Sequence, residues 1–193
     1  SRWRWVWAAM GDWLGVVTPN SHGSLPTQWP ETRSVAMGFR VVSVSQVVAL
    51  HAGVVDKFIG DGLMAVFLPS TLKDNHALRA VRAGMQMQKE LTRIKEDWQS
   101  RRPEVKDIGI RIGINSGEMV AGNIGSQSRM EYTVIGDNVN VASRIESNGQ
   151  VGEVLVGEAT YQRVRSQGVR AERLEPLSVK NREQPVDVYR IMI

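Results

Sequence analysis

Three short segments of this 193-residue sequence carry polar and charged side chains at spacings that could bind a cation or a phosphate group. The first holds Lys57 and Asp61, with Asp61 between two glycines and two short apolar runs. Gly-Asp-Gly between such runs predicts a hairpin turn, and a carboxylate on that turn could bind a hard cation. The same tripeptide is also common turn chemistry, and Lys57 could be a solvated residue of an edge strand. Spacing alone favours this second interpretation.

The second segment predicts a helix from Gly136-Asp137 to about Ser147, with Asp137 as its N-cap. Asn140 and Arg144 are four residues apart on it and therefore share a face. Arginine offers a planar, permanently charged fork that suits phosphate, and asparagine offers a donor and an acceptor that suit a sugar oxygen. Taken alone, such a pair is more often an exposed polar face than a site.

The third segment is a basic loop that holds Lys180 and Arg182 before an apolar terminal run. These two basic side chains could bind a polyphosphate. Without further context, a solvated turn explains the loop better.

Composition sets limits on the class of protein. Hydrophobic residues make up 42% and charged residues 23%, which fits a globular domain with a real core. The absence of cysteine excludes a disulfide scaffold, a Cys-ligated zinc site and thiol catalysis. The net charge of +4 is small and scattered, so we expect no nucleic-acid partner. The sequence contains no run of 18 apolar residues, so no membrane-spanning helix is predicted.

The elements that must position these side chains follow from hydrophobic periodicity. A long helix is expected from Asp74, as its N-cap, to Arg101, and a shorter one over Glu158–Ser166. Asn115-Ser116-Gly117 is predicted to be a turn between two paired strands. The predicted strands are Val54–Phe58, Leu63–Leu68, Ile108–Ile114, Met119–Ile124, Tyr132–Ile135, Val154–Val156, Arg173–Val179 and Val186–Met192. This order predicts an α+β domain with helices packed on a mostly antiparallel sheet.

Taken together, the segments resemble the catalytic domain of the class III nucleotide cyclases, the adenylate and guanylate cyclases. The resemblance covers roughly residues 47–193, and its most specific segment is Gly136–Arg144. The matching pieces are Asp56–Asp61, Gly113–Gly117, Gly122–Ser126, Tyr132–Arg144, Val179–Lys180 and Pro185–Tyr189.

The resemblance implies a ferredoxin-like fold that works as a head-to-tail homodimer. Two metal ions, Mg²⁺ or Mn²⁺, are held by two aspartates of one subunit, and the other subunit contacts base, ribose and phosphates. The ribose 3′-hydroxyl attacks the α-phosphate, and pyrophosphate leaves. By motif position, Asp61 matches the second metal aspartate, Asn140 the ribose-orienting residue and Arg144 the residue that stabilises the transition state. Arg182 falls near the triphosphate-binding lysine, a role that Lys180 could share.

Lys57 and Thr133 match the two positions that select the base. Lysine is typical of adenylate cyclases, and threonine at the second position occurs in a bacterial group of them. A lysine donates to adenine N1, whereas guanine presents a donor there. The resemblance therefore implies a bacterial-type adenylate cyclase that converts ATP to cyclic AMP.

The N-terminal part of the chain departs from the family pattern. Asp12 matches the first metal aspartate, and it stands 49 residues before Asp61, a few more than is usual. The alternation of Trp3, Trp5 and Trp7 predicts a strand, but residues 1–46 also hold a Pro-rich run and most of the tryptophans. Two explanations stay open: Asp12 is the true ligand with a divergent loop behind it, or this segment is foreign to an otherwise single domain of residues 1–193.

Two alternatives to an adenylate cyclase remain. One is a catalytically silent cyclase-like module that dimerises or binds nucleotide, and the other is a guanylate cyclase, which Lys57 disfavours. The expected location is the cytoplasm, with a membrane tether left open. The expected regulatory domain lies upstream, outside these residues.

Overall fold

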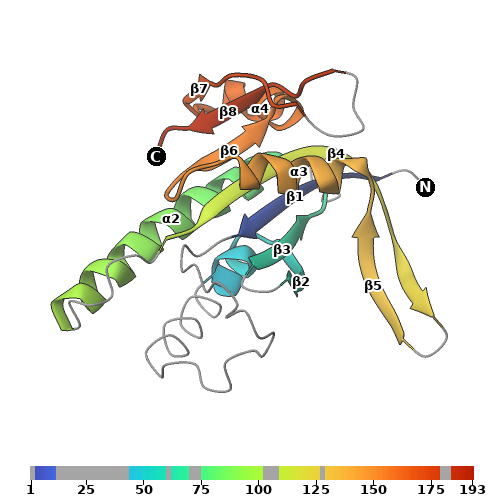
Figure 1. The fold of residues 1–193 in the computed structure, drawn as a ribbon, viewed down its shortest axis with the longest axis horizontal. Helices are drawn as coiled ribbons and strands as arrows, with labels where there is room; N and C mark the ends of the chain where they lie inside the picture. The colour runs from blue at the N-terminus through green and yellow to red at the C-terminus, as the bar shows by residue number, and fades with distance from the viewer. Residues whose placement is uncertain are drawn as a thin grey trace, which may run out of the picture.

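The computed structural model describes residues 3–11, 44–59, 62–69, 75–101, 109–126, 129–178 and 184–193 (Figure 1). Its strands form one large sheet with the order β2-β3-β1-β4-β6-β8-β7, and β5 pairs with β4 beyond the main sheet. The β4–β6 pair is parallel, and the other strand pairs are antiparallel. The strands are β1 (Trp3–Gly11), β2 (Val54–Ile59), β3 (Gly62–Phe67), β4 (Arg111–Ser126), β5 (Arg129–Ile135), β6 (Val154–Gly157), β7 (Ala171–Arg173) and β8 (Val188–Ile191).

Helices cover both faces of this sheet, and residue alternation along the strands explains why. On β3, Leu63, Ala65 and Phe67 join one apolar cluster with α2 and the helical residues 44–50, while Met64 and Val66 join another with α3. Side chains alternate between faces of a strand, so each face acquires its own core. The helices are α2 (His76–Arg101), α3 (Asp137–Ser147), α4 (Glu158–Val164) and the short 3₁₀ helix η1 (Arg165–Gln167). The α+β class expected from the sequence is confirmed.

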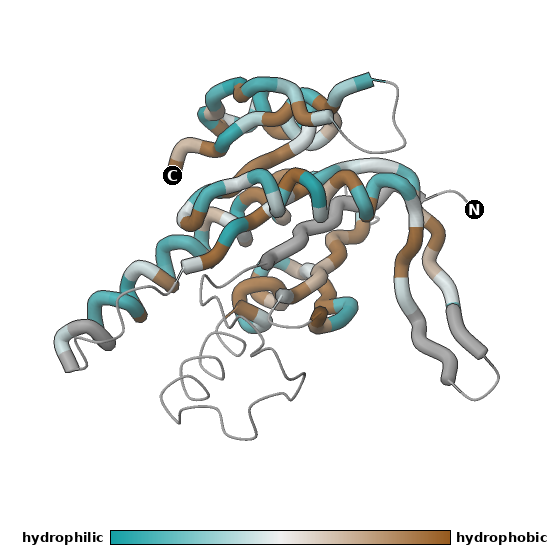
Figure 2. The backbone as a smooth tube through the Cα atoms, viewed as in Figure 1, coloured by the Kyte–Doolittle hydropathy of each residue, from teal (hydrophilic) through white to brown (hydrophobic). Residues whose placement is uncertain are grey.

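The hydropathy of the residues along the chain follows this division into core-facing and solvent-facing sides (Figure 2). Helix α2 alternates hydrophilic and hydrophobic residues along its length, as expected for a helix with one face on a sheet. Its N-terminus is capped by Asn75, whose Oδ1 accepts a hydrogen bond from the Leu78 amide at 3.2 Å. The expected cap, Asp74, lies outside the described residues.

The turn predicted at Asn115-Ser116-Gly117 is wrong, because β4 runs straight through these residues. They pair with Trp7, Val6 and Trp5 of β1 in an unbroken ladder. Asn115 and Ser116 are buried, and the Ser116 hydroxyl meets that of Thr160 at 2.8 Å. Polar residues that usually favour turns are held extended here because their side chains find partners inside the fold.

Two strand assignments also differ from expectation. The strand partner of the second half of β4 is β5, in register from Val120 with Ile135 to Ser126 with Arg129. Near the C-terminus, Arg173 ends β7, and Leu177 makes an isolated bridge with Val186 instead of continuing a strand.

The N-terminal strand β1 lies in the middle of the sheet, between β3 and β4 (Figure 1). Met10 pairs with Leu63 and Gly11 with Arg111. β1 ends at Gly11 and β3 begins at Gly62, so the strand ends that adjoin Asp12 and Asp61 in the sequence are neighbours. Residues 12–43 lie outside the described residues.

Candidate functional site

Four of the seven site residues expected from the sequence are described by the structure: Lys57, Thr133, Asn140 and Arg144. The two expected metal ligands, Asp12 and Asp61, and the triphosphate-binding Arg182 lie outside the described residues, as does Lys180. Among the described residues, no group of three or more His, Cys, Asp and Glu side chains could hold a metal ion.

Lys57 and Thr133 come together through a residue to which sequence analysis gave no role, Asp56. The Thr133 hydroxyl donates to Asp56 Oδ2 at 2.8 Å, and Lys57 Nζ lies 3.8 Å from the same oxygen. Thr133 is 6% exposed, and the Asp56 and Lys57 side chains are 8% and 32% exposed. The cluster Asp56–Lys57–Thr133 therefore places one accessible cation beside a nearly buried hydroxyl and carboxylate.

A β-bulge makes this clustering possible. The register of β2 against β3 runs from Val55 with Ala65 to Lys57 with Met64, so Asp56 is the extra residue. In a regular strand, consecutive side chains point to opposite faces, whereas a bulge breaks that alternation and redirects a side chain. The bulge thus explains how Asp56 and Lys57 approach one another, and Asp56 in turn links β2 to β5.

Asn140 and Arg144 lie on the same side of α3, as the spacing predicted, and this side is exposed. The opposite side of the helix is buried through Val141, Ala142 and Ile145. Their burial fixes which side of the helix faces solvent. Because β5 leads into α3 through Gly136 alone, Thr133 and the exposed side of α3 are joined by a very short connection.

Helix α3 lies unusually close to β4, and two glycines of that strand permit the approach. A Cβ on Gly113 would stand 2.3 Å from the Glu146 backbone nitrogen, and one on Gly117 would stand 2.1 Å from the Asn138 side chain. Such distances leave no room for a side chain. Gly117 is therefore required by close packing and does not mark a turn.

Hydrogen bonds hold the first turn of α3 on β4. Asn115 Nδ2 donates to the Asn138 carbonyl and to Asn138 Oδ1, both at 3.2 Å, and Asn138 Nδ2 donates to the Glu118 carbonyl at 3.0 Å. The predicted cap, Asp137, is wrong: Gly136 occupies the N-cap, without a side-chain cap hydrogen bond. Asp137 is instead in the first turn, where its charge favours the positive end of the helix dipole.

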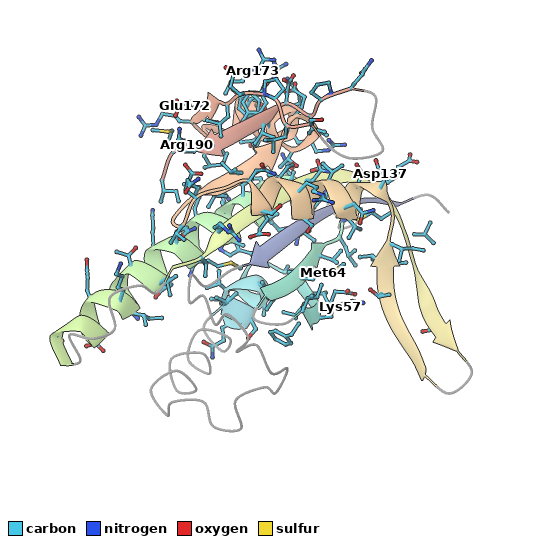
Figure 3. All side chains as sticks on the ribbon, in the orientation of Figure 1. Lys57, Met64, Asp137, Glu172, Arg173 and Arg190 are labelled. Carbon is cyan, nitrogen blue, oxygen red and sulfur yellow. The ribbon has the colours of Figure 1, made fainter. Side chains whose placement is uncertain are left out.

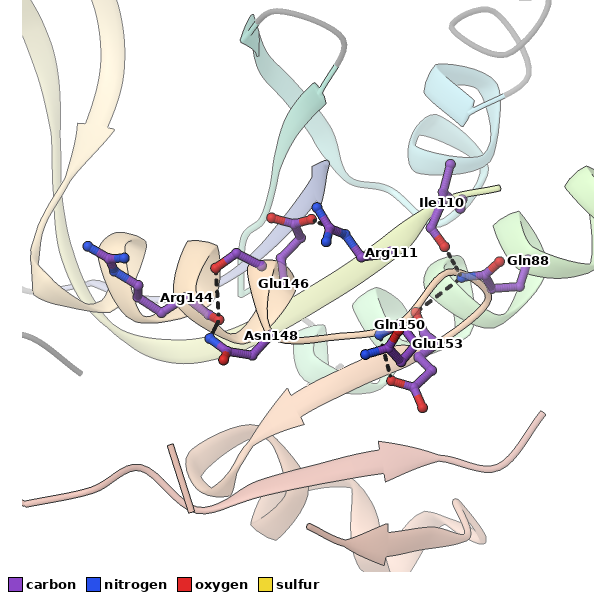
Figure 4. A network of polar contacts seen from close by, with 9 residues as sticks. Gln88, Ile110, Arg111, Arg144, Glu146, Asn148, Gln150 and Glu153 are labelled. Atoms are coloured by element: carbon purple, nitrogen blue, oxygen red, sulfur yellow. Dashed lines mark hydrogen bonds and ion pairs between the residues drawn. The ribbon is translucent and has the colours of Figure 1, made fainter. Parts of the chain in front are cut away.

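The C-terminal end of α3 is fixed by an ion pair, seen from close by in Figure 4. Arg111 Nε on β4 lies 3.1 Å from Glu146 Oε1, and the two side chains are only 17% and 9% exposed. The carbonyl of Arg144 accepts from Asn148 Nδ2 at 2.7 Å, while its guanidinium points away from Glu146 (Figure 4). The helix is thus anchored at both ends, which fixes the backbone from which Asn140 and Arg144 project.

Four residues that position the site were not predicted from the sequence: Asp56, Asn115, Asn138 and Glu146. The first three stand inside the segments that carried the resemblance, so a signal for them was present. Glu146 lies outside those segments and acts through a long-range contact with Arg111.

Comparisons with known proteins agree with this geometry. The family model described as the adenylate and guanylate cyclase catalytic domain matches residues 45–192. An adenylate cyclase of Anabaena cylindrica is 33% identical over 145 residues, 72% of this chain and 28% of that protein. Adenylate cyclase 1 of Rhizobium meliloti is 29% identical over 149 residues, 77% of this chain and 22% of that protein.

Solved structures agree as well. The adenylyl cyclase CyaB of P. aeruginosa superposes with a TM-score of 0.86 at 28% identity, covering 100% of this chain and 95% of that one. The guanylyl cyclase Cya2 superposes with a TM-score of 0.79, also at 28% identity, covering 99% and 92%. Because the chain is similar to both adenylate and guanylate cyclases, its base preference must be argued from the site residues.

No helix among the described residues is long and apolar enough to cross a lipid bilayer. The chain spans less than a third of the length of the curated relatives named above. The family match extends over three quarters of the chain and includes the described site residues. The chain belongs to the adenylate and guanylate cyclase catalytic domain family.

Proposed function

We propose that this domain is an adenylate cyclase, which converts ATP to 3′,5′-cyclic AMP and pyrophosphate. The observation that carries the proposal is the placement of Lys57 beside Thr133 at Asp56. An ammonium group donates hydrogen bonds and cannot accept them, so it complements adenine N1, which is an acceptor. Guanine carries a hydrogen at N1 and would leave two donors facing each other.

The residues on α3 supply the ribose and phosphate contacts in this proposal. Asn140 would orient the ribose, so that its 3′-hydroxyl stands in line with the α-phosphate. Arg144 would donate to the phosphate oxygens as negative charge develops in the transition state. The guanidinium keeps its charge throughout, so it acts by electrostatics and transfers no proton. Arg182, with Lys180, would bind the triphosphate.

Asp12 and Asp61 would hold two divalent ions, Mg²⁺ or Mn²⁺, whose chemistry is to acidify the attacking hydroxyl and to offset phosphate charge. Two features support this fit. Carboxylate oxygens are the ligands that these hard ions prefer, and the neighbouring strand ends Gly11 and Gly62 adjoin the two aspartates in the sequence. The same strand pairing supports the inclusion of the N-terminal segment in the catalytic domain.

A second copy of the chain would complete each site. Large apolar side chains are half or more exposed on two parts of the sheet: Phe58 and Ile59 on β2, and the cross-strand pair Val120 and Ile135 at the base of the β4–β5 hairpin. Apolar surface of this kind is commonly covered by a partner. A homodimer would bury it and bring the metal aspartates of one copy to the base-reading residues of the other.

An assay with ATP and with GTP tests the proposal. The purified chain is given each nucleotide with Mn²⁺ and with Mg²⁺, over a range of protein concentrations. We expect cyclic AMP in excess of cyclic GMP, no product in the presence of EDTA, and activity per subunit that rises with protein concentration. A folded dimer that yields no cyclic nucleotide would support a silent module, and preferential cyclic GMP formation would support a guanylate cyclase.

A further inference from the structure

We propose that Asp56 is a positioning residue that makes the domain selective for adenine, by fixing the direction of the Thr133 hydroxyl. This inference rests on the proposed function, in which Thr133 faces the purine. It adds a residue that touches both base-reading side chains.

The Thr133 hydroxyl is the group on which Asp56 acts. A hydroxyl has one hydrogen to donate and two lone pairs to accept with. In the structure, Thr133 Oγ1 donates to Asp56 Oδ2 at 2.8 Å. Its hydrogen is therefore engaged, and the lone pairs are what it can offer to a ligand.

The two purines differ at the atom that such a hydroxyl would meet. Adenine carries an amino group at C6, which donates, and guanine carries an oxygen there, which accepts. A Thr133 that offers only lone pairs accepts a hydrogen bond from the adenine amino group. It makes none with the guanine oxygen, because both atoms are acceptors. A Thr133 free to rotate could serve either purine, so threonine alone gives little discrimination.

Burial makes the constraint strong. The Asp56 side chain is 8% exposed and Thr133 is 6% exposed, so water has little access to replace either group. Hydrogen bonds to an ionised acceptor are stronger than those between neutral groups. The β-bulge that presents Asp56 is the kind of local irregularity that redirects a side chain next to a functional site.

Asp56 acts on Lys57 as well. Its Oδ2 lies 3.8 Å from Lys57 Nζ, which biases the flexible lysine toward Thr133. One carboxylate thus arranges an acceptor and a donor side by side. That pattern complements adenine, with its donor at C6 and its acceptor at N1. Guanine presents an acceptor at C6 and a donor at N1, so it would place an acceptor against Thr133 and a donor against Lys57.

The experiment measures base preference in matched variants. Asp56→Ala removes the acceptor, Asp56→Asn keeps an acceptor oxygen, and Glu172→Ala removes a carboxylate of the Arg190 ion pair at the far end of the sheet (Figure 3). For each variant, kcat/KM is measured with ATP and with GTP, along with thermal unfolding. We expect the ATP to GTP ratio to fall about tenfold in Asp56→Ala, the worth of one hydrogen bond, and by less than about threefold in the other two.

A double mutant isolates the route through the hydroxyl. Thr133→Val removes the group on which Asp56 acts, so Asp56→Ala should lower the ratio much less in that background. Equal losses for ATP and GTP in Asp56→Ala, or a fall in Asp56→Asn as large as in Asp56→Ala, would overturn the inference. If Asp56→Ala fails to fold, Asp56→Val removes the same acceptor with a residue that favours strands.

A binding measurement separates this inference from the proposed function. Calorimetry with 3′-deoxy-ATP and 3′-deoxy-GTP reports base preference without the attacking hydroxyl and therefore without turnover. An inactive chain that still prefers the adenine analogue, and loses that preference in Asp56→Ala, would contradict the proposed enzyme and keep the role of Asp56. If the chain is active and ATP-selective, but Asp56→Ala changes neither the kcat/KM ratio nor the binding preference, the proposed enzyme is supported and the role of Asp56 is contradicted. Absence of binding to either analogue would overturn both.

Discussion

The cluster at β2 and β5 and the C-terminal end of the sheet both hold carboxylates beside cations, yet their surroundings differ. At Asp56, the carboxylate is 8% exposed and accepts from a buried hydroxyl. At the other end, Arg173 lies 2.8 Å from Asp187, but the two side chains are 61% and 35% exposed (Figure 3). Water screens the second pair and competes with it, whereas the first is held by the fold.

Distance alone therefore does not determine how much a polar contact contributes. The exposed Arg173–Asp187 pair is shorter than the Lys57–Asp56 contact. Burial decides how much each contact contributes, because a buried group that loses its partner cannot turn to water. Buried polar contacts should therefore govern base choice and helix position, and exposed ones should matter little.

The largest effect is expected at the exposed side of α3. Arg144→Ala should lower turnover by about 10²–10³, the usual loss when one preorganised donor to a transition state is removed. The measurement is steady-state cyclic AMP formation at saturating ATP. Arg165→Ala, an exposed arginine of η1, serves as the control and should keep wild-type turnover. An Arg144→Ala enzyme as active as this control would remove Arg144 from the site.

The next prediction compares the stability lost when a nearly buried ion pair and an exposed ion pair are broken. Glu146→Ala leaves Arg111 without its nearly buried carboxylate and should destabilise the fold by about 3 kcal/mol. Asp187→Ala breaks the exposed pair with Arg173 and should shift the urea midpoint far less. Urea unfolding followed by circular dichroism measures both. Equal shifts in the two variants would show that burial does not rank these pairs.

A charge reversal in the cluster Asp56–Lys57–Thr133 should follow. Lys57→Glu places a second carboxylate next to Asp56, and under the proposed function it would face adenine N1 with an acceptor. The ATP to GTP ratio of kcat/KM should fall about 10- to 100-fold, since a mismatched polar contact costs about 1–3 kcal/mol. Lys89→Glu on the exposed side of α2 makes the same charge change away from the site. An unaltered ratio in Lys57→Glu would mean that Lys57 does not read the base.

The smallest effect belongs to the C-terminal end. A hydrogen bond to Glu158 raises the pKa of Tyr189 from 10.0 to about 12. The native state therefore favours the neutral phenol, and this contribution is complete below pH 10 and is lost as the pH rises from 10 to 12. Wild type should lose stability over that window more than Tyr189→Phe does, as measured by urea midpoints at pH 9 and pH 11.5.

Tyr161→Phe is the matched control for this alkaline effect, because its ring stacks on Tyr189 with centroids 4.0 Å apart. It should keep the wild-type pH dependence. Identical pH profiles for wild type and Tyr189→Phe would show that the Glu158 contact does not favour the neutral phenol.

The placement of some candidate site residues could be predicted because it depends on local spacing. Asn140 and Arg144 are four residues apart, and 3.6 residues per turn place them on one side of any helix that forms there. The β2–β3 hairpin was likewise predicted from two apolar runs and a Gly-Asp-Gly turn signal. These features require only neighbours in the sequence.

Other features could not be predicted because distant segments decide them. Asn115, Ser116 and Gly117 have the composition of a turn, yet β1 pairs with them and Asn138 packs on Gly117. Asn75 and Asp74 are both good N-cap residues by type. Asn75 caps α2, and its Nδ2 also donates to the distant Arg163 carbonyl at 2.6 Å. Local preference is weak, and long-range pairing outweighs it.

Residue types at fixed spacing were enough to predict the family, the α+β class, and the side chains proposed to contact a nucleotide. The bulge in β2 that joins Asp56 to Thr133 of β5, 77 positions away, is visible only in the folded chain. The same is true of the ion pair by which Arg111 and Glu146 fix the end of α3. A carboxylate acquires its role from burial and from the donors around it, and both are properties of the folded chain.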